Sequence, residues 1–176
     1  MLTNALSNDT CNVTRAQLRF LPDRPELYHE LVTMACDMQG YFSVVLRDAP
    51  THGQEQFLRQ SEFGLHGVMQ SRCWPGTRLL EHEAEVRFYR ANSSTIKTFL
   101  GTDTFLRWMP PSLPEDLCIW TPDLQWLVGS TAHEKDVFTN VLQQAHPLFE
   151  ILRLRLDRLG VVPIPFAEYH ADDSTS

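Results

Sequence analysis

Apolar and polar residues recur along most of the chain with the spacings of regular secondary structure. Between Pro25 and Gly40 the apolar positions repeat every three or four residues, which is the period of an amphipathic helix. These positions are Leu27, Leu31, Met34 and Met38. Pro25 suits a first helical turn and Gly40 a C-terminal stop, so the pattern predicts one helix between them.

Several other segments have the pattern of strands. Tyr41–Arg47 is rich in β-branched and aromatic residues, which predicts a strand buried on both faces, and Phe63–Gln70 predicts a second strand. Leu80–Tyr89 alternates strictly, with Glu81, Glu83 and Glu85 on one side. Leu80, His82, Ala84, Val86 and Phe88 occupy the other side, which we expect to face the core.

The second half of the chain begins with a predicted β-hairpin. Its strands are Leu117–Trp120 and Gln125–Val128, joined by a turn that contains Pro122. The segment 137–145 fits a strand or a helix equally well. From Pro147 to Leu159 an apolar stripe predicts a helix, although the alternation in LRLRLDRL also fits a strand.

Short helices are predicted at two further places. Gln54–Gln60 is one, and a second begins with Asn92, Ser93 or Ser94 as its cap and extends to Leu100. With 176 residues and no linker or repeat, the chain is predicted to form a single α+β domain. We expect a mostly antiparallel sheet of four to six strands, with helices mainly on one face.

The two ends of the chain differ in composition from the middle. Residues 1–20 are polar and weakly patterned, which predicts an N-terminal arm or a short edge strand. Residues 21–162 contain all the patterned segments and form the predicted domain. Residues 163–176 contain prolines and acidic residues, which predicts a partly disordered acidic tail.

The overall charge of −7 argues against a nucleic-acid partner, because phosphate binding depends on clustered lysine and arginine. No stretch approaches the roughly 20 apolar residues of a membrane span, and the N-terminus lacks a secretory signal pattern, so we expect a cytoplasmic protein without a membrane partner. The four cysteines match no metal or redox spacing and are predicted to be reduced. They are Cys11, Cys36, Cys73 and Cys118.

Two charged clusters are candidates for chemistry. His133, Glu134 and Asp136 lie together after the hairpin, and imidazole and carboxylate groups at such spacing bind metals or exchange protons. The spacing does not match a helical HExxH site, so a charged surface turn is the simpler interpretation. Glu115-Asp116 form a second acidic pair, but side chains of neighbouring strand residues diverge, which favours a structural role.

The Glu81, Glu83 and Glu85 ladder is predicted to be solvated or to face a basic partner, because like charges on one strand face repel each other. His82 would then be a core histidine. The four tryptophans are core candidates, and an exposed pair such as Trp120 and Trp126 would form a binding hot spot.

Established catalytic motifs are missing from the sequence. It contains no GxSxG, no Walker loop and no GxGxxG, and none of its cysteines has the sequence context of a catalytic nucleophile. The sequence therefore predicts no catalytic residue, metal ligand or cofactor.

The segments LPEDLCIW, Trp126-Leu127-Val128 and AHEKDVF resemble a pattern in small uncharacterised bacterial proteins, some of the immunity or antitoxin type. This resemblance covers residues 113–138. It implies a stand-alone cytoplasmic bacterial protein that binds and neutralises another protein.

The sequence favours a non-catalytic protein-binding module of the immunity or inhibitor type, whose partner is another protein such as a basic toxin or effector. The predicted contact residues are Glu81, Glu83, Glu85, Trp120, Trp126, His133, Glu134 and Asp136. The alternative is a metal-dependent hydrolase built around His133, Glu134 and Asp136, with Glu115 or Asp116 brought in by the fold. The sequence does not predict the oligomeric state.

Overall fold

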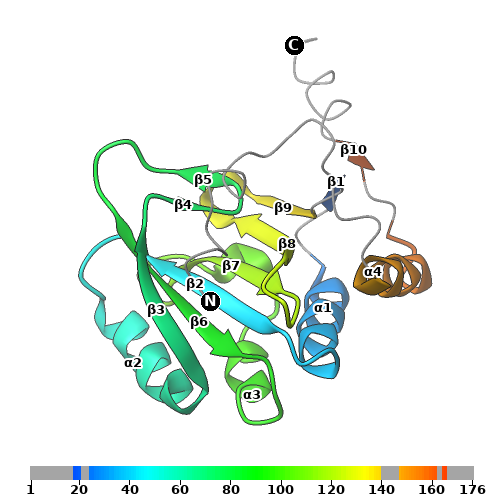
Figure 1. Cartoon of the computed structure of the whole chain (residues 1–176), viewed down its shortest axis with the longest axis horizontal. Coiled ribbons are helices and arrows are strands. Elements are labelled where there is room, and N and C mark those ends of the chain that lie inside the picture. Colours follow the sequence, from blue (N-terminus) through cyan, green and yellow to red (C-terminus); the bar gives the residue numbers. More distant parts are fainter. Residues whose placement is uncertain (1–17, 21–23, 140–146, 162–163, 166–176) are drawn as a thin grey trace.

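The protein forms an antiparallel sheet with helices on one face and a small hairpin on the other (Figure 1). The computed structural model describes residues 18–20, 24–139, 147–161 and 164–165. The predicted single-domain α+β architecture is confirmed.

Six strands of four or more residues make up most of the sheet, and short β1 and β10 extend it. The order is β10-β1-β9-β8-β7-β2-β6-β3, and every pairing is antiparallel. The strands are β1 Leu18–Phe20, β2 Tyr41–Leu46, β3 Leu65–Ser71, β6 Ala84–Arg90, β7 Glu115–Trp120, β8 Trp126–Thr131, β9 Asp136–Thr139 and β10 Ile164–Pro165.

The helices lie mainly on one side of this sheet (Figure 1). They are α1 Pro25–Asp37, α2 His52–Ser61, α3 Ile96–Phe99 and α4 Pro147–Arg158, with single 3-10 turns η3 Glu62–Gly64, η4 Phe105–Arg107 and η5 Ala132–Glu134. The hairpin of β4 Cys73–Trp74 and β5 Thr77–Arg78 covers the opposite face. There Trp74 packs in a second core with Val45, Val86 and Trp120.

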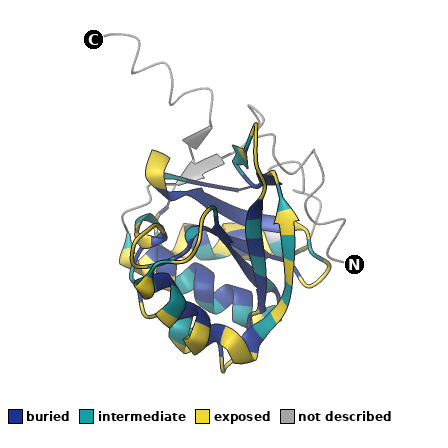
Figure 2. Ribbon diagram, turned by 90° about the vertical axis from the view of Figure 1, so that its left-hand side faces the viewer, coloured by how far each residue is buried: buried dark blue, intermediate teal, exposed yellow. Residues whose placement is uncertain are grey.

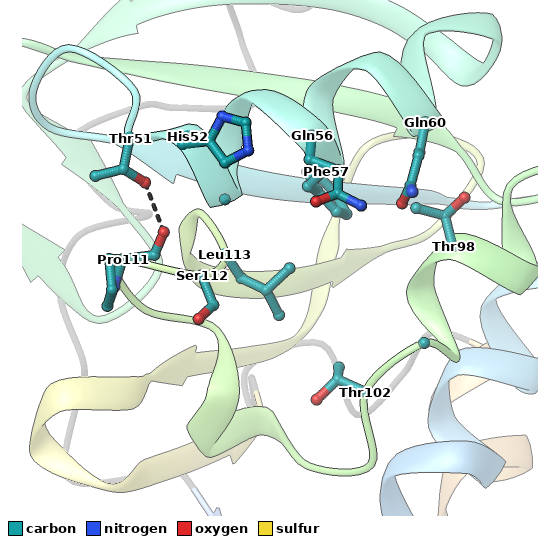
Figure 3. Close-up of a pocket in the computed structure, with 12 residues that line it drawn as sticks. Thr51, His52, Gln56, Phe57, Gln60, Thr98, Thr102, Pro111, Ser112 and Leu113 are labelled. Atoms are coloured by element: carbon teal, nitrogen blue, oxygen red, sulfur yellow. Dashed lines mark hydrogen bonds between the residues drawn. The ribbon is translucent and has the colours of Figure 1, made fainter.

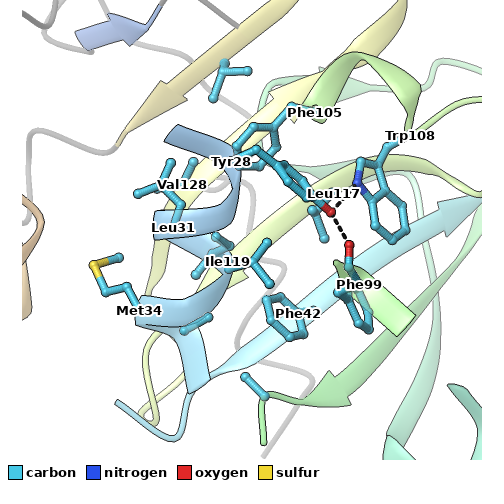
Figure 4. Close-up of a cluster of buried hydrophobic side chains, with 14 of the residues drawn as sticks. Tyr28, Leu31, Met34, Phe42, Phe99, Phe105, Trp108, Leu117, Ile119 and Val128 are labelled. Carbon is cyan, nitrogen blue, oxygen red and sulfur yellow. Dashed lines mark hydrogen bonds between the residues drawn. The ribbon is translucent and has the colours of Figure 1, made fainter. Parts of the chain in front are cut away.

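The larger core fills the space between the helices and the sheet (Figure 4). Phe99 stacks on Phe42 of β2, with ring centroids 4.1 Å apart, and also on Trp108. Tyr28 of α1 joins this aromatic group by hydrogen bonds, because its hydroxyl donates to the Phe99 carbonyl and accepts from Trp108 Nε1. Figure 2 shows that buried residues are concentrated in the strands and on the inner sides of the helices.

Most predicted elements are confirmed. The helix from Pro25, the two-sided burial of Tyr41–Leu46 and the hairpin of β7 and β8 are all present. The segment from Pro147 is a helix rather than a strand. Residues 137–139 belong to β9, and the rest of that ambiguous segment lies outside the described residues.

The prediction for Leu80–Tyr89 is wrong in its first half. The strand β6 begins only at Ala84; Leu80 is 87% exposed and His82 is also exposed, so His82 is not a core histidine. The reason is the neighbouring strand, because β3 ends at Ser71, which pairs with Ala84, and the chain then turns into the β4–β5 hairpin. Residues 80–83 therefore form a connecting loop.

Among the described cysteines, the predicted reduced state is wrong at Cys73. Cys73 is disulfide-bonded, whereas Cys36 and Cys118 are free thiols. Cys11 lies outside the described residues, as does most of the predicted N-terminal arm and acidic tail. In the part of the chain that the structure describes, no helix has both the length and the apolar character that a membrane span requires.

Candidate metal centre

An irregularity at the start of β7 determines where its two acidic residues point. Ser43 pairs with Cys118 and Val45 with Glu115, so the single residue Val44 lies opposite two residues of β7. Asp116 is one of these two and has φ +52°, in the left-handed region that few side chains adopt. This bulge redirects Asp116, so the prediction that Glu115 and Asp116 diverge is wrong.

Asp116 is fully buried and both of its carboxylate oxygens accept hydrogen bonds. Trp74 Nε1 donates to Oδ2 over 2.9 Å, and the backbone N–H of Ala132 donates to Oδ1 over 3.1 Å. The carboxylate thus connects the β4–β5 hairpin to the η5 turn, which contains His133. These contacts hold the side chain of Asp116 in one position.

Arg47 follows β2 and lies against both acidic residues. Its Nε is 2.7 Å from Glu115 Oε2, and its Nη2 is 3.5 Å from Asp116 Oδ2. The guanidinium also lies over the Trp74 ring, 5.5 Å from the ring centroid. Two carboxyl groups therefore share one guanidinium.

His133 completes the group from η5. Glu115, Asp116 and His133 each offer one ligand atom, and these three atoms lie within 4.8 Å of one another. The same residues line a cavity of about 210 Å³. Its remaining lining residues are Arg47, Trp108, Met109, Pro110 and Ala132. Since the His133 side chain is 44% exposed, solvent reaches one side of the cluster.

Burial shifts the protonation of both carboxyl groups. Desolvation raises the pKa of Asp116 above its ordinary value, and the hydrogen bonds from Trp74 and Ala132 and the charge of Arg47 oppose this shift. Desolvation also raises the pKa of Glu115, with Arg47 again opposing it. A cation bound between these groups would favour their ionised forms and reverse both shifts.

Two residues of the predicted His133 cluster lie outside this group. Glu134 is exposed, and its Oε1 is 3.7 Å from His133 Nε2. Asp136 begins β9 and pairs with Thr131. The three ligand atoms belong to His133, Glu115 and Asp116, so of the predicted core of the metal site only His133 is present, and Glu115 and Asp116 take the places of Glu134 and Asp136.

The residues predicted to contact a partner are dispersed. Glu81 and Glu83 are exposed in the loop before β6, whereas Glu85 lies within β6 and pairs with Arg87, its Oε1 2.6 Å from Nε. Trp120 and Trp126 are buried in the second core, so the predicted exposed pair does not form.

Two residues that hold this site together, Arg47 and Trp74, have no signal in the sequence. Arg47 lies at the end of a predicted buried strand, and its ion pairs depend on the bulge in β7. Trp74 is one of the four core candidates, but its position beside Pro75 and Gly76 gives no signal that its indole will donate to a carboxylate 42 residues away.

A larger cavity lies beside the metal-site candidate and differs from it in chemistry (Figure 3). It has a volume of about 580 Å³ between α2, the end of α3 and residues 111–113. Its polar side chains are mostly neutral and include Gln56, Gln60, Thr98 and Thr102. Pro110 lines the smaller cavity and Pro111 the larger one, so the two cavities share this wall.

Comparison of the chain with protein-family models, with curated proteins and with solved structures gave no match.

Proposed function

We propose that this protein is a divalent-cation-dependent hydrolase whose ion binds Glu115, Asp116 and His133. The observation that supports this proposal is the convergence of three ligand atoms within 4.8 Å at a cavity. Two carboxylates and one imidazole are ligands that Zn²⁺ and Mn²⁺ accept. Three protein ligands also leave coordination positions open for water and substrate.

Arg47 affects both the ion and the substrate. Because its guanidinium contacts both carboxylates, an incoming cation competes with Arg47 for Glu115, and we expect the ion to displace the guanidinium toward the cavity. There a positive charge would stabilise the negative charge that develops on an acyl or phosphoryl oxygen. Glu134 is exposed beside His133, with its Oε1 3.7 Å from His133 Nε2, so it would act on the imidazole through its charge rather than through a direct hydrogen bond.

The hydrolytic step follows from these positions. Glu115, Asp116 and His133 would hold the ion, and a divalent ion bound there would supply two effects: it would make a nearby water more acidic and would polarise a carbonyl or phosphoryl oxygen. The leaving group would then take a proton from solvent at the open side of the cavity. We expect esters or phosphoesters to be the substrate class.

Hydrolysis of nitrophenyl acetate and nitrophenyl phosphate, with and without added Zn²⁺ or Mn²⁺, tests this function. We expect turnover that depends on the added cation. Glu115→Gln and His133→Ala should each reduce it by at least about tenfold, since even the loss of a group that supports a metal ligand costs about 10–100-fold. Glu55→Gln, on the exposed side of α2, is the control and should keep full activity. Turnover that is equal with and without cation would contradict the proposal.

A second candidate function is the binding of a basic protein. The supporting observation is the loop 79–83, in which the exposed Leu80 lies beside the exposed Glu81 and Glu83, on a chain of net charge −7. An apolar side chain surrounded by acidic groups suits a basic partner of the toxin or effector kind.

Charge reversal tests this binding surface. A Glu81→Lys/Glu83→Lys variant should lose a stoichiometric basic protein that the wild type captures from the host lysate. Glu150→Lys on α4 is the matched control. Equal capture by the wild type and the loop variant would contradict the surface assignment.

The cytoplasmic compartment expected from the sequence stays a proposal. The disulfide at Cys73 weighs against it, because disulfides persist mainly in oxidising compartments. Fractionation of the host, with detection by an antibody against the chain, would show whether the protein is in the cytoplasm or in an oxidising compartment.

A further inference from the structure

The sheet edge formed by β3 has features that mark an interaction surface. Among the strands that the structure describes, β3 pairs only with β6, so the outward backbone groups of Leu65–Ser71 have no strand partner (Figure 1). Such an edge is a template for another strand. Proteins usually protect an edge with charged side chains or proline, yet the sequence LHGVMQS contains neither.

The side chains on this edge are uncharged and partly apolar. Val68, at the middle of the strand, is 44% exposed, and its side chain lies on the sheet face that the helices partly cover, beside Arg87 of β6. A register shift between Leu65 and Gly67 disturbs the first residues of the strand, while Gly67–Ser71 pairs regularly with β6. The regular part is therefore available for pairing.

The two large apolar residues with the highest exposed fraction in the described part of the chain lie at opposite ends of this edge. Phe63, 62% exposed, precedes the strand in η3. Leu80, 87% exposed, lies near its other end, because the neighbouring Leu79 N–H donates to the carbonyl of Arg72, which follows Ser71. If a second copy paired its β3 antiparallel to the first, Phe63 of each copy would lie near Leu80 of the other.

The charges at the two ends are complementary in the same way. Glu62 is exposed in η3, which leads into β3, and Arg72 is exposed just after the end of β3. A two-fold axis near Val68 would place Glu62 of each copy beside Arg72 of the other. Self-complementarity of this kind is what a two-fold interface requires, because the same patch serves on both subunits.

From these features we infer that two copies of this chain associate by antiparallel pairing of their β3 strands, forming one continuous sheet across a two-fold axis. The inference does not depend on the proposed hydrolase function. The cation cluster lies at β7 and η5, whereas the pairing strand is at the far edge beyond β2 and β6.

Sedimentation of the full chain over a range of concentrations tests the inference. We expect the wild type to show a monomer–dimer equilibrium. Val68→Glu should raise the dissociation constant of the dimer by at least about tenfold, because the two new carboxylates would repel each other near the two-fold axis. The new carboxylate lies beside Arg87 within the same copy, so it is tolerated in the monomer. Leu154→Glu, a similarly exposed apolar residue on α4, is the control and should dimerise as the wild type does.

A charge exchange identifies the interface independently. Glu62→Arg alone and Arg72→Glu alone should each weaken the dimer, and the double variant Glu62→Arg/Arg72→Glu should restore it. A wild type that remains monomeric at millimolar concentration would overturn the inference. A dimer that is unaffected by Val68→Glu, or a double variant no tighter than the single variants, would overturn it as well.

Discussion

At the scale of single residues, Asp116 determines the arrangement of the site. It combines a left-handed backbone, complete burial and two accepted hydrogen bonds. Residues in such sparsely populated backbone regions persist only where their surroundings hold them, and they concentrate at functional sites. Here the indole of Trp74 and the backbone of Ala132 provide that support.

Asp116→Asn should lower the free energy of unfolding by about 1–3 kcal/mol, because the amide has only one oxygen for the two donors and turns an N–H group toward one of them. Trp74→Phe should also lower the free energy of unfolding, because it removes the indole N–H that donates to Asp116. Urea unfolding of both single variants and the double variant measures the coupling between the two side chains. Fully additive losses would contradict the hydrogen bond as the source of the effect.

The pH dependence of stability tests the protonation of Asp116. Burial raises the pKa of Asp116 above the ordinary 3.8. At pH values between 3.8 and this raised pKa, Asp116 is therefore protonated in the folded protein but ionised in the unfolded chain. The contribution of this group to stability is therefore greatest below pH 3.8 and falls as the pH rises through the raised pKa. Unfolding experiments at several pH values should show the gap between wild type and Asp116→Asn narrowing as the pH increases; a widening gap would contradict the assignment.

At the scale of elements, the sequence predicted what local periodicity determines. The helix from Pro25 and the strand Tyr41–Leu46 follow from apolar spacing alone. The limits of β6 did not follow, since its length depends on where β3 ends. The convergence of Glu115 and Asp116 also depended on the neighbour, because a bulge is defined only by pairing with β2.

The docking of α1 depends on one polar contact inside an apolar core. Tyr28→Phe removes the group that accepts from Trp108 Nε1 and donates to the Phe99 carbonyl, and leaves both without this partner. We expect a loss of about 1–3 kcal/mol in the free energy of unfolding, measured in urea. Tyr41→Phe, at a half-buried ring on β2, is the control and should lose less. Equal losses in the two variants would contradict the role of this contact.

At the scale of the whole molecule, the chain carries a net charge of −7 and a disulfide at Cys73. In the unfolded, unreduced protein, iodoacetamide should modify Cys36 and Cys118 but reach Cys73 only after reduction. Peptide mass spectrometry detects each site. Removing the disulfide by Cys73→Ala should cost about 2–4 kcal/mol of stability. Modification of Cys73 without reduction would contradict the disulfide.

The proposed hydrolase requires that Glu115, Asp116 and His133 together bind one divalent cation. Calorimetric titration of the metal-free protein with Zn²⁺ and with Mn²⁺ tests it directly. We predict one equivalent of bound ion, with tighter binding as the pH rises, because a cation favours the ionised form of the carboxyl groups whose pKa burial raises. Glu115→Gln and His133→Ala should each weaken binding by at least about tenfold. If the wild type bound no ion, or if both substitutions left binding unchanged, the proposed cation site would be contradicted.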